Sequence, residues 1–81
     1  MERERVNAYT VVFQPALEGG FVATVPVLPG CMSQGETLDE ARREIKDAIR
    51  TYLSVLREDG DNIPQESVDQ IVERVIAPDP V

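Results

Sequence analysis

The chain has 81 residues and a formal net charge of −7, from 15 acidic and 8 basic side chains. A chain of this length forms one small domain, whose modest core makes self-association a natural supplement. Its 42% hydrophobic and 28% charged residues are typical of a folded, soluble domain. The acidity disfavours duplex DNA as a partner unless the basic side chains gather on one patch. It fits either a basic protein partner or a need for solubility alone.

Other classes of protein are excluded by what the sequence lacks. No apolar run approaches the roughly 18–20 residues that cross a bilayer, and no apolar segment follows the charged N-terminus, so we expect neither a membrane protein nor a signal peptide. The absence of histidine removes the usual general base and the commonest metal ligand. A single cysteine forms no internal disulfide, which fits a cytoplasmic location.

The first part of the chain is expected to form a small antiparallel sheet. Residues 8–15 and 21–27 are rich in β-branched and aromatic side chains in alternation, and they predict two strands. Two glycines in the short connection between them allow the positive φ angles of a hairpin loop. The Pro29–Gly30 turn then leads into residues 31–35, which predict a third short strand.

Residues 38–59 carry the signals of one long amphipathic helix. Thr37 and Glu40 form a capping box at its start, in which the Thr37 hydroxyl accepts from the amide of residue 40 and the Glu40 side chain reaches back to the Thr37 amide. Gly60 ends the helix. Apolar residues at three- and four-residue spacing predict its buried face: Leu38, Ala41, Ile45, Ala48, Ile49, Tyr52, Leu53 and Leu56.

The charged side chains of this helix separate onto two flanks of the apolar face. We interpret both flanks as solvated borders of a helix that faces the core, with a docking face on one flank as the alternative. A basic flank would suit RNA or an acidic partner. The basic flank consists of Arg43, Lys46, Arg50 and Arg57, and the acidic flank of Glu40, Glu44, Asp47 and Glu58.

The C-terminal segment fits two structures. Its apolar residues follow a helical period, whereas residues 71–77 also read as a β-branched strand. We favour a strand over about residues 70–77, because a further strand would complete a sheet for the helix to cover. The predicted fold is thus a single α+β domain in the order β-β-β-α-β, an antiparallel sheet covered on one face by one long helix.

No catalytic, cofactor-binding or metal-binding site is expected. Cys31 has no histidine to activate it and no Lys or Arg within ten residues in sequence, so it reads as a small buried hydrophobic residue. The three predicted strands carry no Asp or Glu to form a two-metal nuclease site. Residues 58–62 resemble part of a calcium loop but lack its spacing and its closing glutamate.

Two stretches carry a family likeness. The predicted hairpin leads into VPVLPGCMSQGETLDEA at residues 25–41, and the helix leads into LREDGDNIPQE at residues 56–66. In order and spacing, this resembles the HicB family of antitoxins, whose usual pattern is Pro-Asp-Leu-Pro-Gly-Cys, a Thr-x-x-Glu-Ala helix start, and an exit of Glu-Asp-Gly and then Ile-Pro. The resemblance runs over residues 9–66. Val27 stands where the pattern more often has Asp.

The resemblance implies a degenerate ribonuclease H-like fold and a function. Members of the family bind a small basic HicA-type toxin, which cleaves mRNA, and mask its active site. Many also carry a C-terminal DNA-binding segment. The 15 residues that follow Glu66 leave no room for one, so no direct DNA binding is expected from this chain alone.

The surface around residues 28–34, together with exposed acidic side chains, is the expected partner-binding face. Two alternatives stay open. One is a self-associating structural or regulatory module, a dimer or tetramer formed by pairing of sheet edges. The other is an RNA-binding domain that uses the basic flank of the helix. The candidate contact residues of the partner-binding face are Leu28, Pro29, Gly30, Met32 and Gln34.

Overall fold

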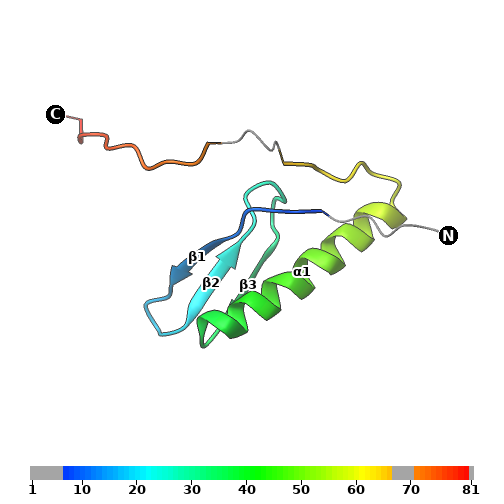
Figure 1. Ribbon diagram of the computed structural model, residues 1–81, viewed down its shortest axis with the longest axis horizontal. Helices are drawn as coiled ribbons and strands as arrows, with labels where there is room; N and C mark the ends of the chain where they lie inside the picture. Colours follow the sequence, from blue (N-terminus) through cyan, green and yellow to red (C-terminus); the bar gives the residue numbers. More distant parts are fainter. Residues whose placement is uncertain (1–6, 67–70, 81) are drawn as a thin grey trace.

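The computed structural model describes residues 7–66 and 71–80 (Figure 1). Three strands, β1 (Val12–Pro15), β2 (Phe21–Thr24) and β3 (Met32–Gly35), precede one long helix, α1 (Leu38–Glu58). The strands form one antiparallel sheet in the order β1-β2-β3, and α1 packs mainly against β3 and β2. The prediction of a small α+β domain, with an antiparallel sheet followed by one long helix, is confirmed.

The hairpin between β1 and β2 has the expected chemistry. Val12 pairs with Thr24 at one end of the ladder and Pro15 pairs with Phe21 at the other. The connecting loop closes through Gly20, which has φ of 76° and lies so close to β3 that a Cβ atom there would be 2.5 Å from the Gly35 carbonyl oxygen. Only glycine fits this position, because it combines a positive φ with the absence of a side chain.

The loop between β2 and β3 is folded into the core. Three backbone hydrogen bonds close it, from the amide of Val25 to the Cys31 carbonyl, from Leu28 to Val25, and from Cys31 to Leu28, at 2.9–3.1 Å. These bonds satisfy the backbone of the loop and turn the Leu28 side chain inward, where it is fully buried. Pro29 and Gly30 stay exposed at the tip.

A compact apolar cluster fills the space between sheet and helix. Cys31 is 5% exposed, so the prediction that it is a core residue is confirmed. Partly buried aromatic and aliphatic side chains from β1, the loop and α1 surround the cluster. Its buried members are Ala23, Val25, Leu28, Cys31 and Ile45.

Helix α1 begins and ends close to the predicted limits. The Thr37 side chain accepts from the Glu40 amide at 3.0 Å, as the capping box requires. The Glu40 carboxylate, however, accepts from the amide of Glu36 at 3.1 Å, and not from that of Thr37. At the other end, Gly60 has φ of 74° and donates to the Arg57 carbonyl, which stops the helix.

The chain after α1 returns to the start of β1. The Glu66 carboxylate accepts from both the amide and the hydroxyl of Thr10, at 2.6 and 2.8 Å, and the Tyr9 hydroxyl donates to the Pro64 carbonyl at 2.6 Å. Burial, and then the nearby Glu66 carboxylate, raise the pKa of Tyr9, which keeps this donor protonated. We call this set of contacts the Glu66 clamp.

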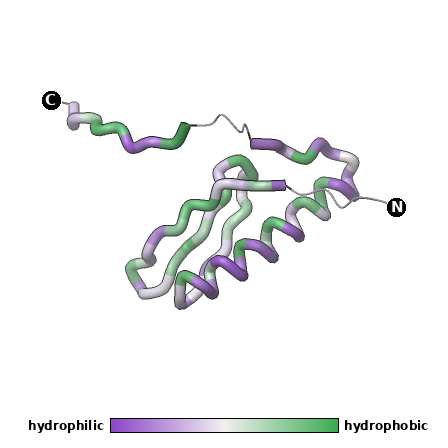
Figure 2. The backbone as a smooth tube through the Cα atoms, viewed as in Figure 1, coloured by the Kyte–Doolittle hydropathy of each residue, from purple (hydrophilic) through white to green (hydrophobic). Residues whose placement is uncertain are grey.

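Residues 71–80 run away from the sheet and helix, and no helix or strand forms within them (Figure 1). The strand predicted over about residues 70–77 is therefore absent from residues 71–77, while residue 70 lies outside the described residues. A strand would place Glu73 on one face and Arg74 on the other, each between two apolar side chains, so neither face is wholly apolar. Figure 2 shows that this segment contains hydrophobic residues. They are exposed to solvent, with exposed fractions of 73–96% for Ile71, Val72, Val75 and Ile76.

Candidate partner-binding site

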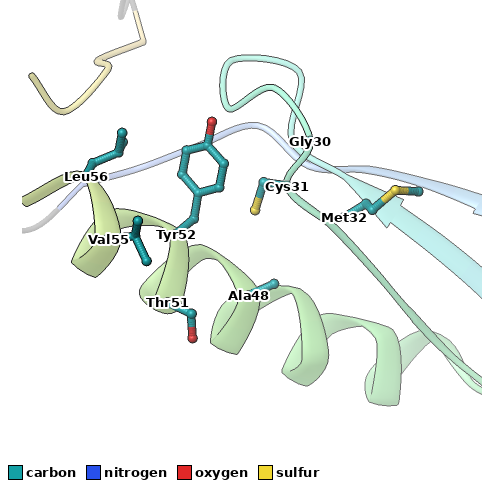
Figure 3. A pocket seen from close by; sticks show the side chains of 8 residues that line it. All are labelled: Gly30, Cys31, Met32, Ala48, Thr51, Tyr52, Val55 and Leu56. Carbon is teal, nitrogen blue, oxygen red and sulfur yellow. The ribbon is translucent and has the colours of Figure 1, made fainter. Parts of the chain in front are cut away.

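An apolar cleft of about 600 Å³ lies between the second half of α1 and the start of β3 (Figure 3). The loop and strand side contributes Gly30, Cys31 and Met32. The helix side contributes Ala48, Thr51, Tyr52, Val55 and Leu56. Because the cleft is open to solvent and mostly apolar, its chemistry suits the side chains of another macromolecule.

Tyr52 fixes the geometry of this cleft. Its ring stands up from α1 toward the loop (Figure 3), and its hydroxyl donates to the Pro29 carbonyl at 2.8 Å. The hydrogen bond ties the exposed tip of the loop to the helix over 23 residues of sequence. The two walls of the cleft are thus held at a set distance, in keeping with a preformed binding surface.

Cys31 contributes apolar surface and not nucleophilic chemistry. Burial raises the pKa of its thiol, so the group is protonated near neutral pH. The reactive form of cysteine is the thiolate, which this environment disfavours. Among residues 7–66 and 71–80, moreover, no group of three or more His, Cys, Asp or Glu is placed to hold a metal ion.

Two large apolar side chains stand exposed at the rim of the cleft. Met32 on β3 is 58% exposed and Val55 on α1 is 51% exposed. Full burial of an aliphatic side chain contributes about 1.5–3 kcal/mol, and about half of each side chain is still exposed for a partner to bury. A partner that also covers these two rim side chains therefore gains binding free energy in addition to what it gains by filling the centre of the cleft.

The acidic flank of α1 borders this cleft. Glu44 lies four residues before Ala48, and Glu58 lies three residues after Val55, which are the spacings at which side chains are neighbours on a helix. Neither glutamate makes an ion pair within the described parts of the chain. Asp47, by contrast, accepts from Arg50 at 3.4 Å. The cleft consequently has a negatively charged border.

The basic flank lies beyond the acidic flank on the solvent-exposed face of α1, further around the helix from the cleft. All four of its side chains are exposed, as expected for a solvated face, and they line no part of the cleft. Exposed pairs such as the one between Arg50 and Asp47 contribute little to stability. RNA binding by Arg43, Lys46, Arg50 and Arg57 stays a prediction.

The five candidate contact residues are divided by the structure. Gly30 and Met32 line the cleft, Pro29 accepts the Tyr52 hydrogen bond, and Gln34 is exposed further along β3. The prediction that Leu28 contacts a partner needs correction, because its side chain is fully buried and leaves no surface for a partner to touch.

The sequence pattern does not predict that residues of α1 form one wall of the cleft. Ala48, Tyr52 and Leu56 were assigned to the buried face, and Val55 was assigned to no face. An apolar residue at the border of an amphipathic stripe, next to an acidic flank, was the available signal for Val55.

The fold and the cleft together define a class of protein: a small acidic α+β domain with an open apolar cleft between its helix and its sheet. Residues 4–79 match the HicB-like antitoxin family of bacterial toxin-antitoxin systems. Because this match spans most of the 81 residues, the chain belongs to that family. The likeness inferred from the sequence motifs is confirmed. Within the part of the chain that the structure describes, no helix is long and apolar enough to span a membrane.

Individual relatives differ in how much of their length this chain matches. The UPF0150 protein Ta0767 of Thermoplasma acidophilum is 41% identical over 63 residues, which are 78% of this chain and 91% of that protein. The UPF0150 protein ssr1765 of Synechocystis is 37% identical over 65 residues, 80% of this chain and 82% of that protein. Antitoxin HicB of Escherichia coli K12 is 39% identical over 59 residues, 73% of this chain but only 43% of that protein.

Proposed function

We propose that this chain is a non-catalytic antitoxin that binds a small basic toxin of the HicA type and masks its mRNA-cleaving site. The observation that carries the proposal is membership of the HicB-like antitoxin family over residues 4–79. The net charge of −7 supports a basic partner, since complementary charge speeds association and favours the correct complex. Such a complex would act in the cytoplasm, where mRNA is translated.

A non-catalytic role agrees with the chemistry of the described residues. The thiol of Cys31 is buried and protonated, and the charged side chains of α1 lie on its solvent-exposed flanks. Inhibition by a stoichiometric protein requires only a complementary surface that covers the active site of the toxin.

Co-purification and growth rescue test this function. The chain is co-expressed with a small basic HicA-type toxin, and the toxin is captured through an affinity tag. We expect a stable complex and recovery of growth when the chain is induced, with a catalytically inactive toxin as the control for toxicity. Capture without this chain, together with no rescue of growth, would contradict the proposal.

Self-association into a dimer or tetramer is a second candidate function, and the exposed apolar segment at residues 71–76 favours it. Four large β-branched side chains in one short segment are costly to leave in water, and burial between copies would remove that cost. The two functions are compatible, because an antitoxin can bind its toxin as an oligomer.

The mass of the free protein in solution tests the second candidate. Val72→Glu combined with Ile76→Glu should shift an oligomer toward the monomer, because it places two charges in the buried contact. Glu73→Gln is the matched control in the same segment and should leave the mass unchanged. Light scattering after size-exclusion chromatography provides the measurement; a monomeric wild type at high concentration would exclude self-association.

A further inference from the structure

We propose that the apolar cleft between α1 and β3 is the place where the basic toxin docks, with an apolar side chain of the toxin in the cleft and its Lys or Arg side chains over Glu44 and Glu58. The inference rests on the proposed function and specifies where the partner binds. Its surface differs from the predicted loop face, because most of it comes from α1.

The first argument is the combination of an apolar centre and an exposed apolar rim. The centre contains Tyr52 and Cys31, and the rim contains Met32 and Val55, which are each more than half exposed. Binding free energy in protein complexes is concentrated in a few apolar anchors that fill such pockets. One anchor from the partner, packed between Met32 and Val55, would remove both rim side chains from water.

The second argument is the free edge of β3. The sheet order is β1-β2-β3, so β2 pairs with one side of β3 and no described strand pairs with the other. Met32 belongs to this edge strand and also lines the cleft. A partner at the cleft therefore has unpaired backbone groups of β3 within reach, and addition of a strand to a sheet edge is a recurrent mode of recognition.

The third argument is charge, and it identifies the occupant. Glu44 and Glu58 border the cleft, whereas the basic flank lies further around α1 from it. A basic partner gains from this border. Residues 71–76 of this chain or of a second copy contain one acid and one base, Glu73 and Arg74, and so gain nothing from it.

The position of the chain's own C-terminal segment supports the same assignment. The Glu66 clamp holds the chain beside Thr10, at the approach to β1. Strand β1 is at the opposite edge of the sheet from β3. Residues 71–80 thus leave the domain at the far edge from the cleft (Figure 1), which stays available to a partner.

Isothermal titration calorimetry with the HicA-type toxin that the chain co-purifies with, in a catalytically inactive form, tests the proposal. Val55→Glu and Met32→Glu are made separately in the full chain, and both positions are exposed enough to accept a charge without loss of the fold. Each should weaken binding at least about tenfold, as the loss of an interface anchor does. Thermal unfolding of the free variants checks that the domain is intact.

A pair of double variants tests the charge argument. Glu44→Gln with Glu58→Gln should lower the affinity and reduce its dependence on salt, because two charges of the border are removed. Glu18→Gln with Asp79→Asn changes the net charge of the chain equally, at exposed positions that do not line the cleft, and should leave the affinity close to that of the wild type.

The outcomes separate this inference from the proposed function. If the wild type binds the toxin and the cleft variants bind it equally well, the docking site is wrong while the antitoxin function stands. If Val55→Glu changes only the oligomeric mass of the free protein, the cleft is an interface between copies and the proposal is overturned. If the wild type binds no toxin, both the function and its site are overturned.

Discussion

At the scale of single residues, Gly35 is the point where β3 and the start of α1 come closest. A Cβ atom at this position would fall against the backbone nitrogen of Ala41 and lie 2.8 Å from the carbonyl carbon of Glu40. Both obstacles are backbone atoms of the first helical turns, which have no rotamer to change. Gly35 therefore sets the spacing between sheet and helix, and through it the width of the cleft further along α1.

Gly35→Ala should destabilise the domain by about 1–3 kcal/mol, because the added methyl group forces the helix away from the sheet. The measurement is the free energy of unfolding in urea. Gln34→Ala, at the adjacent exposed strand position, is the control and should change stability by less than about 0.5 kcal/mol. Equal effects of the two substitutions would contradict the close-approach argument.

At the scale of elements, the hairpin and the helix could be predicted because their signals are local. Alternating side chains around a glycine loop define the hairpin, and the apolar stripe together with Thr37 and Gly60 defines α1. The capping box differed only in its second half, where the Glu40 carboxylate reaches the amide of residue 36. The two donor amides, of residues 36 and 37, are adjacent along the chain, so sequence spacing alone does not distinguish them.

The features that were predicted incorrectly depend on how the chain packs in three dimensions. Leu28 lies between two prolines and reads as an exposed loop residue, yet the turn hydrogen bonds with Val25 and Cys31 carry it into the core. The C-terminal strand was predicted from β-branched side chains, but a strand also needs a neighbour, and none of the described strands is positioned beside residues 71–80. The cleft forms only where α1 packs beside β3, so no local sequence pattern predicts it.

At the scale of the whole molecule, the Glu66 clamp closes the domain by joining its two ends. Thr10 and Glu66 are separated by 56 residues, and their two hydrogen bonds hold the chain beyond α1 to the start of β1. They do so together with the bond from the Gln65 side chain to that of Asn7 at 3.0 Å. The Tyr9 hydroxyl adds a further bond across 55 residues. These bonds therefore fix the course of the chain after α1 across the domain.

Glu66→Gln tests this closure. The carboxylate accepts two hydrogen bonds from Thr10, and its charge strengthens both of them. A glutamine at this position is neutral, and its NH2 group keeps the second contact only if the Thr10 hydroxyl turns to accept, so both bonds are weakened. We expect a loss of about 1–2 kcal/mol in the free energy of unfolding, in the range for a hydrogen bond to a charged group that is partly buried. Glu58→Gln, on the exposed flank of α1, controls for the change in net charge and should be close to neutral. Hydrogen exchange of the Thr10 amide provides a second readout: faster exchange in Glu66→Gln alone would place the effect at the clamp, and unchanged exchange would contradict it.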